Sequence, residues 1–345
     1  MFCNLVGVTS SSARVRSCGY YELSTENSDQ RIATLIREWL ERPVPTANSV
    51  KLRRLGAVIA TTVGAARSQN EDRAVVARVS NSHARTSRIC LLCDGMSVFK
   101  DGRAAAVEAI TAMLISVGKH CSYPPLERLR SGLNAANTAI YRRDPPRAGT
   151  TIAALLLSHD DAVAATVGDS RVYSFSKQTR LRQISIDDTL GQELERLQQD
   201  GGPRLNLTRF SRRLTKFIGM APTVEGRYYQ LGAGTLSTSY ILSSDGAHWL
   251  GKPAFDAVLS RTLSSHNALD DLIRLSQNTG KPDDASLISI RSNLPKTALG
   301  EQEAPQSRLE VWDSSGKLDI SFDNKESDNG DQPTTDGGFY PVSRS

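Results

Sequence analysis

Two apolar segments that each end in Asp-Gly constrain this 345-residue chain more than any other feature. Residues 89–93 form a continuous apolar run, which predicts a buried strand, and Asp94 and Gly95 follow it directly. Residues 240–244 precede Asp245 and Gly246 in the same way. Either pair alone is compatible with an ordinary turn. Together they predict that two buried strands each carry a carboxylate to the edge of a sheet.

Further acids stand at the boundaries of other apolar segments. The full set of such acids is Glu71, Asp72, Asp94, Asp169, Asp245, Asp283 and Asp284. Carboxylates brought close together repel one another unless a cation neutralises them. Oxygen ligands without histidine or cysteine suit Mg²⁺ or Mn²⁺. The pattern therefore predicts a site for a pair of such ions, and Arg67 is placed to bind an incoming phosphate.

The order of the predicted elements gives an α+β fold. Strands are expected near 58–63, 74–79, 152–157, 162–167, 172–175, 236–243 and 285–290, and helices near 28–42, 103–117, 126–142, 190–199, 254–263 and 269–277. We expect residues 1–52 to be an extension with one amphipathic helix that packs on the body, and residues 53–293 to be the main domain. Residues 294–345 are polar and are expected to form an acidic, largely disordered tail.

Composition narrows the function further. The net charge is +5, but residues 301–345 carry ten acidic and four basic residues, so residues 1–300 carry +11. No zinc-finger spacing or RNA-binding motif accompanies this charge, which argues against a nucleic-acid partner. We also expect no membrane span and no secretory signal. Cys90 and Cys93 lie inside an apolar strand and are expected to be core residues in a reducing, cytoplasmic protein.

Six short motifs resemble, in the same order, those of the PPM family, the metal-dependent protein phosphatases of type 2C, in its bacterial form. They are Arg67-x-x-Asn70-Glu71-Asp72, Asp94-Gly95-Met96, Gly149-Thr150-Thr151, Gly168-Asp169-Ser170-Arg171, Ser244-Asp245-Gly246 and Asp283-Asp284-Ala285-Ser286. The resemblance covers about residues 55–292. Each motif is weakly specific alone, whereas their shared order is specific.

The resemblance implies a four-layer α-β-β-α sandwich, in which two central antiparallel sheets are flanked by helix pairs. By the same resemblance, Asp94 bridges two Mn²⁺ or Mg²⁺ ions, the Gly95 carbonyl binds one, and Asp245 and Asp283 bind the other. Metal-bound waters would be held by Asp72 and by Glu71, and Asp169 would contribute to a third, weaker site. Arg67 would bind the substrate phosphate. The basic loop at 188–216 corresponds to the family's variable flap, where Arg204, Arg209, Arg212 and Arg213 would help to select substrates, or would form a solvated basic surface.

The function implied is that of a protein serine/threonine phosphatase in signal transduction. A water bridging the two ions would attack the phosphorus of phosphoserine or phosphothreonine directly, and the substrates would be proteins phosphorylated by a cognate kinase. The alternatives are a catalytically weak pseudophosphatase that binds phosphoproteins, and a nuclease that uses the same cations. Ser97 and Val98 replace two glycines of the family motif, and Met96 stands where many eukaryotic members have a histidine.

Overall fold

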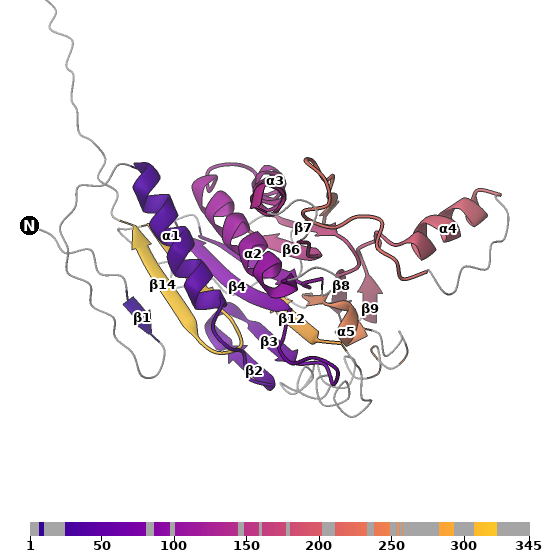
Figure 1. The fold of residues 1–345 in the computed structure, drawn as a ribbon, viewed down its shortest axis with the longest axis horizontal. Helices are drawn as coiled ribbons and strands as arrows, with labels where there is room; N and C mark the ends of the chain where they lie inside the picture. The colour runs from indigo at the N-terminus through magenta and orange to yellow at the C-terminus, as the bar shows by residue number, and fades with distance from the viewer. Residues whose placement is uncertain are drawn as a thin grey trace, which may run out of the picture.

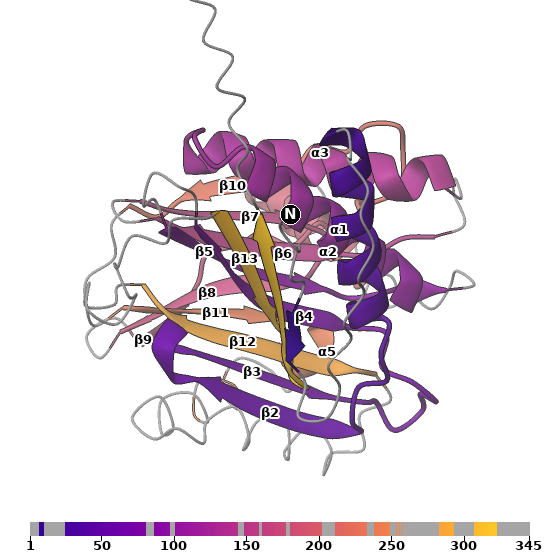
Figure 2. The same ribbon diagram turned by 90° about the vertical axis from the view of Figure 1, so that its left-hand side faces the viewer.

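The computed structural model describes two antiparallel sheets packed face to face, with helices against the outer face of the larger sheet (Figures 1 and 2). The described residues are 7–9, 25–80, 86–96, 101–143, 148–158, 161–176, 180–201, 211–232, 238–248, 253, 255, 257, 283–292 and 307–322. The predicted α+β class and the paired antiparallel sheets are confirmed.

The larger sheet has eight strands. Their order is β1 (Gly7–Thr9), β14 (Lys317–Phe322), β13 (Ser307–Trp312), β4 (Arg73–Ser80), β5 (Thr86–Cys93), β6 (Ile152–Leu157), β7 (Ala162–Val167) and β10 (Arg227–Gln230). The centre of this sheet is apolar on both faces, and every residue of β6 and β7 is buried. Strands that are covered on both sides show a continuous apolar run, as residues 89–93 do.

The smaller sheet has six strands. Their order is β2 (Ala47–Leu52), β3 (Ala57–Thr62), β12 (Ala285–Arg291), β11 (Ser239–Ser243), β8 (Arg171–Ser176) and β9 (Arg180–Gln183). Its central strands adjoin two of the acidic motifs. Strand β11 ends just before Asp245, and β12 begins directly after Asp284. The register pairs Ser243 with Leu287, which brings the two motifs to the same edge.

Alternating side chains of the central strands build separate hydrophobic clusters on the two faces of each sheet. Leu91 and Cys93 face the helices, whereas Cys90 and Leu92 face the smaller sheet. Cys90 and Cys93 are both fully buried and belong to the clusters on opposite sides of β5, so the prediction that they are core residues is confirmed. Phe255 is buried under the outer face of the smaller sheet.

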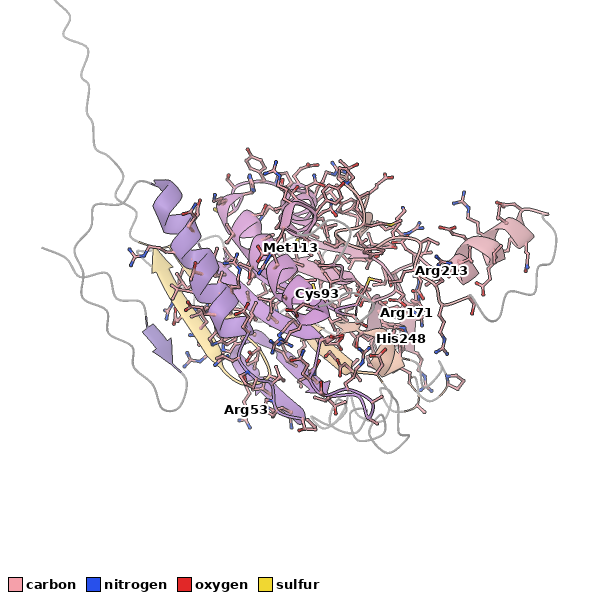
Figure 3. The ribbon with its side chains drawn as sticks, viewed as in Figure 1. Arg53, Cys93, Met113, Arg171, Arg213 and His248 are labelled. Atoms are coloured by element: carbon pink, nitrogen blue, oxygen red, sulfur yellow. The ribbon has the colours of Figure 1, made fainter. Side chains whose placement is uncertain are left out.

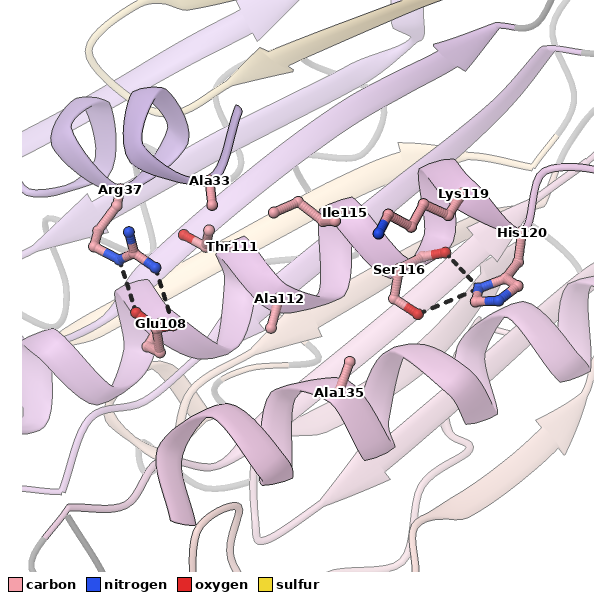
Figure 4. Close-up of a pocket in the computed structure, with 10 residues that line it drawn as sticks. All are labelled: Ala33, Arg37, Glu108, Thr111, Ala112, Ile115, Ser116, Lys119, His120 and Ala135. Carbon is pink, nitrogen blue, oxygen red and sulfur yellow. Dashed lines mark hydrogen bonds and ion pairs between the residues drawn. The ribbon is translucent and has the colours of Figure 1, made fainter. Parts of the chain in front are cut away.

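Three long helices cover the larger sheet: α1 (Thr25–Leu40), α2 (Gly102–Lys119) and α3 (Pro125–Arg143). The predicted packing of the N-terminal helix on the body is confirmed, since Ile36, Trp39 and Leu40 join the core below it. Arg37 of α1 also donates two hydrogen bonds to Glu108 of α2, at 2.8 and 3.1 Å (Figure 4). The helices predicted at 254–263 and 269–277, which would complete the fourth layer, lie almost entirely outside the described residues.

The prediction of a largely disordered tail is wrong for residues 307–322. These residues form the β13–β14 hairpin, and β13 pairs with β4 from Arg308↔Ser80 to Trp312↔Val76. The hairpin folds because Leu309, Val311 and Leu318 alternate with polar residues and lie in the core beneath the helices. The expected boundary after residue 52 is also too late, because β2 belongs to the smaller sheet and pairs with β3.

Candidate active site

The loop between β3 and β4 carries Arg67, Glu71 and Asp72, and a single buried aspartate holds it in place. Asp284 is 2% exposed, and its two carboxylate oxygens accept hydrogen bonds from the amides of Gly64 (2.8 Å) and Glu71 (2.7 Å). Asn70 reinforces the turn, because its side-chain oxygen accepts from the Asp72 amide at 2.9 Å. The first acidic motif is therefore fixed by its contact with the last one.

Asp72 is the most deeply buried of the predicted ligands, at 3% exposure. Its Oδ2 accepts a hydrogen bond from the Ser244 hydroxyl at 2.8 Å. Its Oδ1 is buried and has no hydrogen-bond partner within the described part of the chain. Burial, followed by the charge of Asp284, raises the pKa of Asp72 to about 8. A buried carboxylate oxygen without a partner is costly unless a cation binds it.

Asp94 and Gly95 follow β5, and the Gly149-Thr150-Thr151 motif holds them. The carbonyl of Asp94 accepts from the Thr151 amide (2.9 Å) and from the Thr150 hydroxyl (2.8 Å). The hydroxyl of Thr151 is in turn 2.6 Å from that of Ser170. Gly95 packs against main chain, since a Cβ there would lie 2.3 Å from the Gly102 carbonyl oxygen. This close approach explains why glycine follows the aspartate.

The Asp245-Gly246 and Asp283-Asp284 motifs lie directly against each other. A Cβ on Gly246 would lie 1.6 Å from the carbonyl oxygen of Asp284. The Ser244 hydroxyl, which donates to Asp72, also accepts from the Ser286 amide at 2.9 Å. Residues from three separate motifs are thus joined through Ser244 at one edge of the sandwich.

The negative charges of four predicted ligands act on Asp94. Its pKa is raised well above the ordinary value, first by burial and then by the negative charges of Asp72, Asp245, Asp169 and Asp283. Each of these acids comes from a different loop, and the loops span nearly the whole domain. The sequence prediction that acids from separate motifs meet in space is thereby supported for Asp94 and its neighbours.

Asp169 belongs to the same acidic region but has a second set of neighbours. Burial, followed by the charges of Asp245 and Asp187, raises the pKa of Asp169 to about 7, while a backbone hydrogen bond and the charge of Arg171 oppose the shift. Asp187 is itself paired with Arg171, whose Nη2 lies 2.7 Å from Asp187 Oδ2. Asp169 therefore lies between the acids around Asp94 and the Arg171–Asp187 ion pair.

Arg67 lies at the acidic cluster, bound to two of its members. Its guanidinium donates to Asp283 Oδ1 from Nη2 (2.5 Å) and Nε (3.1 Å), and to Glu71 Oε2 from Nη1 (3.0 Å). These partners outweigh the effect of burial and raise the pKa of Arg67. The side chain is 24% exposed, so a planar cation is held at the acid cluster with part of its surface open to solvent.

The four arginines predicted to select substrates are only partly described. Arg212 and Arg213 are exposed, and the Arg213 carbonyl accepts from the Leu190 amide at 2.9 Å, where α4 (Leu190–Gln199) begins (Figure 3). None of the residues of α4 is buried, and the helix extends away from the body in Figure 1. Arg204 and Arg209, like Ser97 and Val98, lie outside the described residues.

The donor set fits Mn²⁺ or Mg²⁺, although the side chains do not form a finished cage. Within the described residues, no group of three or more His, Cys, Asp or Glu side chains is arranged so that it could hold a metal ion as placed. The charges of four acids from other loops nevertheless raise the pKa of Asp94, which indicates that these acids lie near it. Carboxylate rotamers change at small cost, whereas main-chain hydrogen bonds fix the loops that carry these acids. Partner-free Asp72 Oδ1 and an all-carboxylate set are what a hard cation requires.

A cavity also lies away from the acidic cluster, among the helices. A groove of about 330 Å³ runs between α1, α2 and α3, and its lining includes Arg37, Glu108, Lys119 and His120 (Figure 4). None of the predicted ligands lines it. The charges in this groove are already paired, since Arg37 binds Glu108 and Lys119 binds Asp29. The acidic edge of the sandwich therefore remains the candidate site.

The sequence prediction gives no supporting role to three residues that hold the site, although Asp284 is among its acids. Asp284 fixes the loop of Arg67, Ser244 joins Asp72 to the β11–β12 edge, and Arg73 anchors the loop from the other side. The serine and the second aspartate stand within the motifs, so their positions were visible in the sequence. Their hydrogen bonds to amides and to Asp72 were not, because they depend on how distant loops pack.

Comparison with solved structures identifies the fold. MsPP, a PPM Ser/Thr phosphatase from Mycobacterium smegmatis, matches 69% of this chain and 99% of its own, with a TM-score of 0.55 at 18% identity. Stp1 from Staphylococcus aureus matches 70% and 96%, with 0.55 at 21%. The catalytic domain of PstP, solved with two manganese ions, matches 71% and 99%, with 0.55 at 24%. No family model and no curated protein sequence matches.

The class defined by these matches is that of the bacterial PPM serine/threonine phosphatase fold. The predicted resemblance is confirmed at this level, and each solved chain is matched almost along its whole length. Among the described helices, none has the length and apolar character needed to cross a membrane.

Proposed function

We propose that this protein is a metal-dependent protein phosphatase that hydrolyses phosphoserine and phosphothreonine. The observation that carries the proposal is the gathering of Asp72, Asp169, Asp245 and Asp283 around Asp94 on a PPM fold. Asp94, the Gly95 carbonyl, Asp245 and Asp283 would hold two Mn²⁺ or Mg²⁺ ions. Asp72 and Glu71 would act through bound water, and Asp169 would contribute to a third, weaker site.

The bound ions would supply a water of lowered pKa and a Lewis acid for the phosphoryl oxygens. The chain itself contributes position and charge. Arg67 offers a guanidinium to the phosphate, because its planar donors match phosphate geometry and it lies at the carboxylates already. Ser244 and Asp284 orient Asp72 and the Arg67 loop. Met96 and not a histidine follows Gly95 in the chain, so the proton needed by the leaving group would come from water.

Substrate selection is assigned to the surface beside the site. The exposed Arg212 and Arg213, together with Arg204 and Arg209, would favour acidic sequences around the phosphorylated residue. The natural substrates would be cytoplasmic proteins phosphorylated by a Ser/Thr kinase.

The test is hydrolysis of phosphoserine, phosphothreonine and phosphotyrosine peptides with and without Mn²⁺. We expect Mn²⁺-dependent release of phosphate from the first two peptides, and its loss in Asp94→Asn. Asp161→Asn is the matched control. Asp161 lies in the turn between β6 and β7, at the end of these two strands that is far from Thr151 and Asp169. Equal turnover in wild type and Asp94→Asn would refute the assignment. Mn²⁺ binding without turnover would instead favour the phosphoprotein-binding alternative.

A further inference from the structure

Arg73 joins the predicted metal-binding loop to the N-terminal helix. It is the first residue of β4, follows Asp72 directly, and is 4% exposed. Its guanidinium makes three hydrogen bonds, all to main-chain oxygens: to Leu40 (2.9 Å), Asn70 (3.0 Å) and Asp72 (2.7 Å). Two of these acceptors lie in the loop that carries Asp72, and the third lies in the final residue of α1.

The α1 end of this connection is rigid. The carbonyl of Leu40 is one of the last four of the helix, which have no partner within the helix, so Arg73 satisfies an otherwise orphan acceptor. Trp39 and Leu40 are 4% and 1% exposed and lie in the core under α2. Displacement of this helix end would therefore move the Leu40 carbonyl oxygen, which accepts the hydrogen bond from Arg73.

The C-terminal hairpin reaches the same place from the other side. Its turn is fixed to the N-terminal addition, because Arg42 Nη2 lies 3.2 Å from Asp313 Oδ2 and Asn48 donates to the Ser314 carbonyl at 2.5 Å. A cavity of about 10 Å³, the size of one water molecule, is lined by Asp72 and Arg73 together with Asp313 and Ser314. The end of α1 and the turn of the hairpin thus both reach the surroundings of Asp72.

The carboxylate of Asp72 depends on this support. Its Oδ2 accepts from the Ser244 hydroxyl and Ser286 also lies beside it, whereas its Oδ1 has no partner among the described residues, so the main chain of residues 70–73 helps to set the direction of the carboxylate. Arg73 Nη1 donates to two carbonyls of that segment, those of Asn70 and Asp72. Groups that orient a metal ligand in this way affect metal affinity by about 10- to 100-fold when they are removed.

We propose that Arg73 is a positioning residue that couples the N-terminal helix and the C-terminal hairpin to metal binding at Asp72. The proposal rests on the proposed function, since it assumes that Asp72 serves the metal centre. It assigns a role to α1 and to the β13–β14 hairpin: they hold the loop that carries Asp72 in position. Substrate would approach from the other side, where Arg67 is partly open to solvent.

The test compares Arg73→Lys with Arg88→Lys by calorimetric titration of Mn²⁺. Arg88 is a matched control: it is 5% exposed and also makes three hydrogen bonds to main-chain oxygens, those of Leu55, Arg291 and Ser292. Both variants lose hydrogen bonds that a lysine cannot replace. Only Arg73→Lys should raise the Mn²⁺ dissociation constant, by about tenfold or more, while Arg88→Lys should stay within about twofold of wild type.

A second measurement needs no substitution. Energetic coupling is reciprocal, so Mn²⁺ bound to the wild-type protein should slow amide hydrogen exchange at 37–42 and 313–316 as well as at 70–72. Unchanged exchange in α1 and the hairpin turn, or equal Mn²⁺ affinities in the two lysine variants, would overturn the coupling but leave the phosphatase proposal intact. Failure of the wild type to bind Mn²⁺ would overturn both.

Discussion

The metal-free protein should lose stability as the pH rises from about 4 to about 8, and Asp72 should account for part of that loss. Burial and Asp284 raise the pKa of Asp72 to about 8 in the folded protein, whereas an aspartate in the unfolded chain titrates near 4. Between these values the folded state holds the extra proton, so raising the pH favours unfolding. One proton changes the free energy of unfolding by about 1.4 kcal/mol per pH unit, on the order of 5 kcal/mol over the whole window.

The assay is urea unfolding in EDTA at several pH values between 5 and 8. Asp72→Asn should show a shallower decline of stability with pH than wild type, by about 1 kcal/mol per pH unit. The variant also relieves Asp94, whose pKa is raised partly by Asp72, and this acts in the same direction. Saturating Mn²⁺ should reverse the trend, because the ion competes with protons. The Asp161→Asn control should follow wild type. Parallel pH dependences in wild type and Asp72→Asn would refute the reasoning.

Three further outcomes are expected. Arg67→Ala should raise KM for a phosphothreonine peptide by about 10- to 100-fold at saturating Mn²⁺, because a charged hydrogen-bond donor to phosphate contributes about 1.5–3 kcal/mol; an unchanged KM in steady-state kinetics would remove Arg67 from the phosphate site. Gly246→Ala should lower both the thermal midpoint and the Mn²⁺ affinity, because its Cβ would lie 1.6 Å from the Asp284 carbonyl oxygen. The control Gly118→Ala should lower neither, since no atom lies within 4 Å of its Cβ. Leu309→Ala should reduce the free energy of unfolding by about 2–5 kcal/mol in chemical denaturation, because Leu309 is 3% exposed in the core; a change below about 0.5 kcal/mol would mean that the hairpin does not belong to the cooperative unit.

Central strands and long helices could be predicted because their local patterns agree with their environment. Residues 89–93 are buried on both faces and show a continuous apolar run, and α2 and α3 are found within two residues of the expected bounds. Edge strands were harder, because half of their residues face solvent. β2 and β10 contain few fully buried residues and were not predicted.

The β13–β14 hairpin shows how an average can hide a local pattern. The net charge of −6 over residues 301–345 favours disorder, yet Leu309, Val311 and Leu318 lie in the core. Two of these acids are paired in the described hairpin: Arg78 and Lys317 bind Glu310, and Arg308 binds Asp319. Since Arg78 lies more than two hundred residues from its partner, no local reading of the sequence could pair them.

Site prediction followed the same division. Motif order singles out the acids whose charges act on Asp94, because each acid stands beside a recognisable strand. The supports were invisible, because they involve main-chain atoms of distant segments. Arg73, for example, binds the carbonyl of Leu40, and nothing in either residue type indicates that contact.

The pairing of β13 with β4 also has a consequence for protein synthesis. β4 emerges from the ribosome early, but the strand that covers its outer edge follows more than two hundred residues later, with Ala77 opposite Val311. Until translation reaches residue 322, the nascent chain exposes the edge of an apolar strand, which is a template for aggregation. Truncated expression products that stop near residue 293 should accordingly collect in the insoluble fraction.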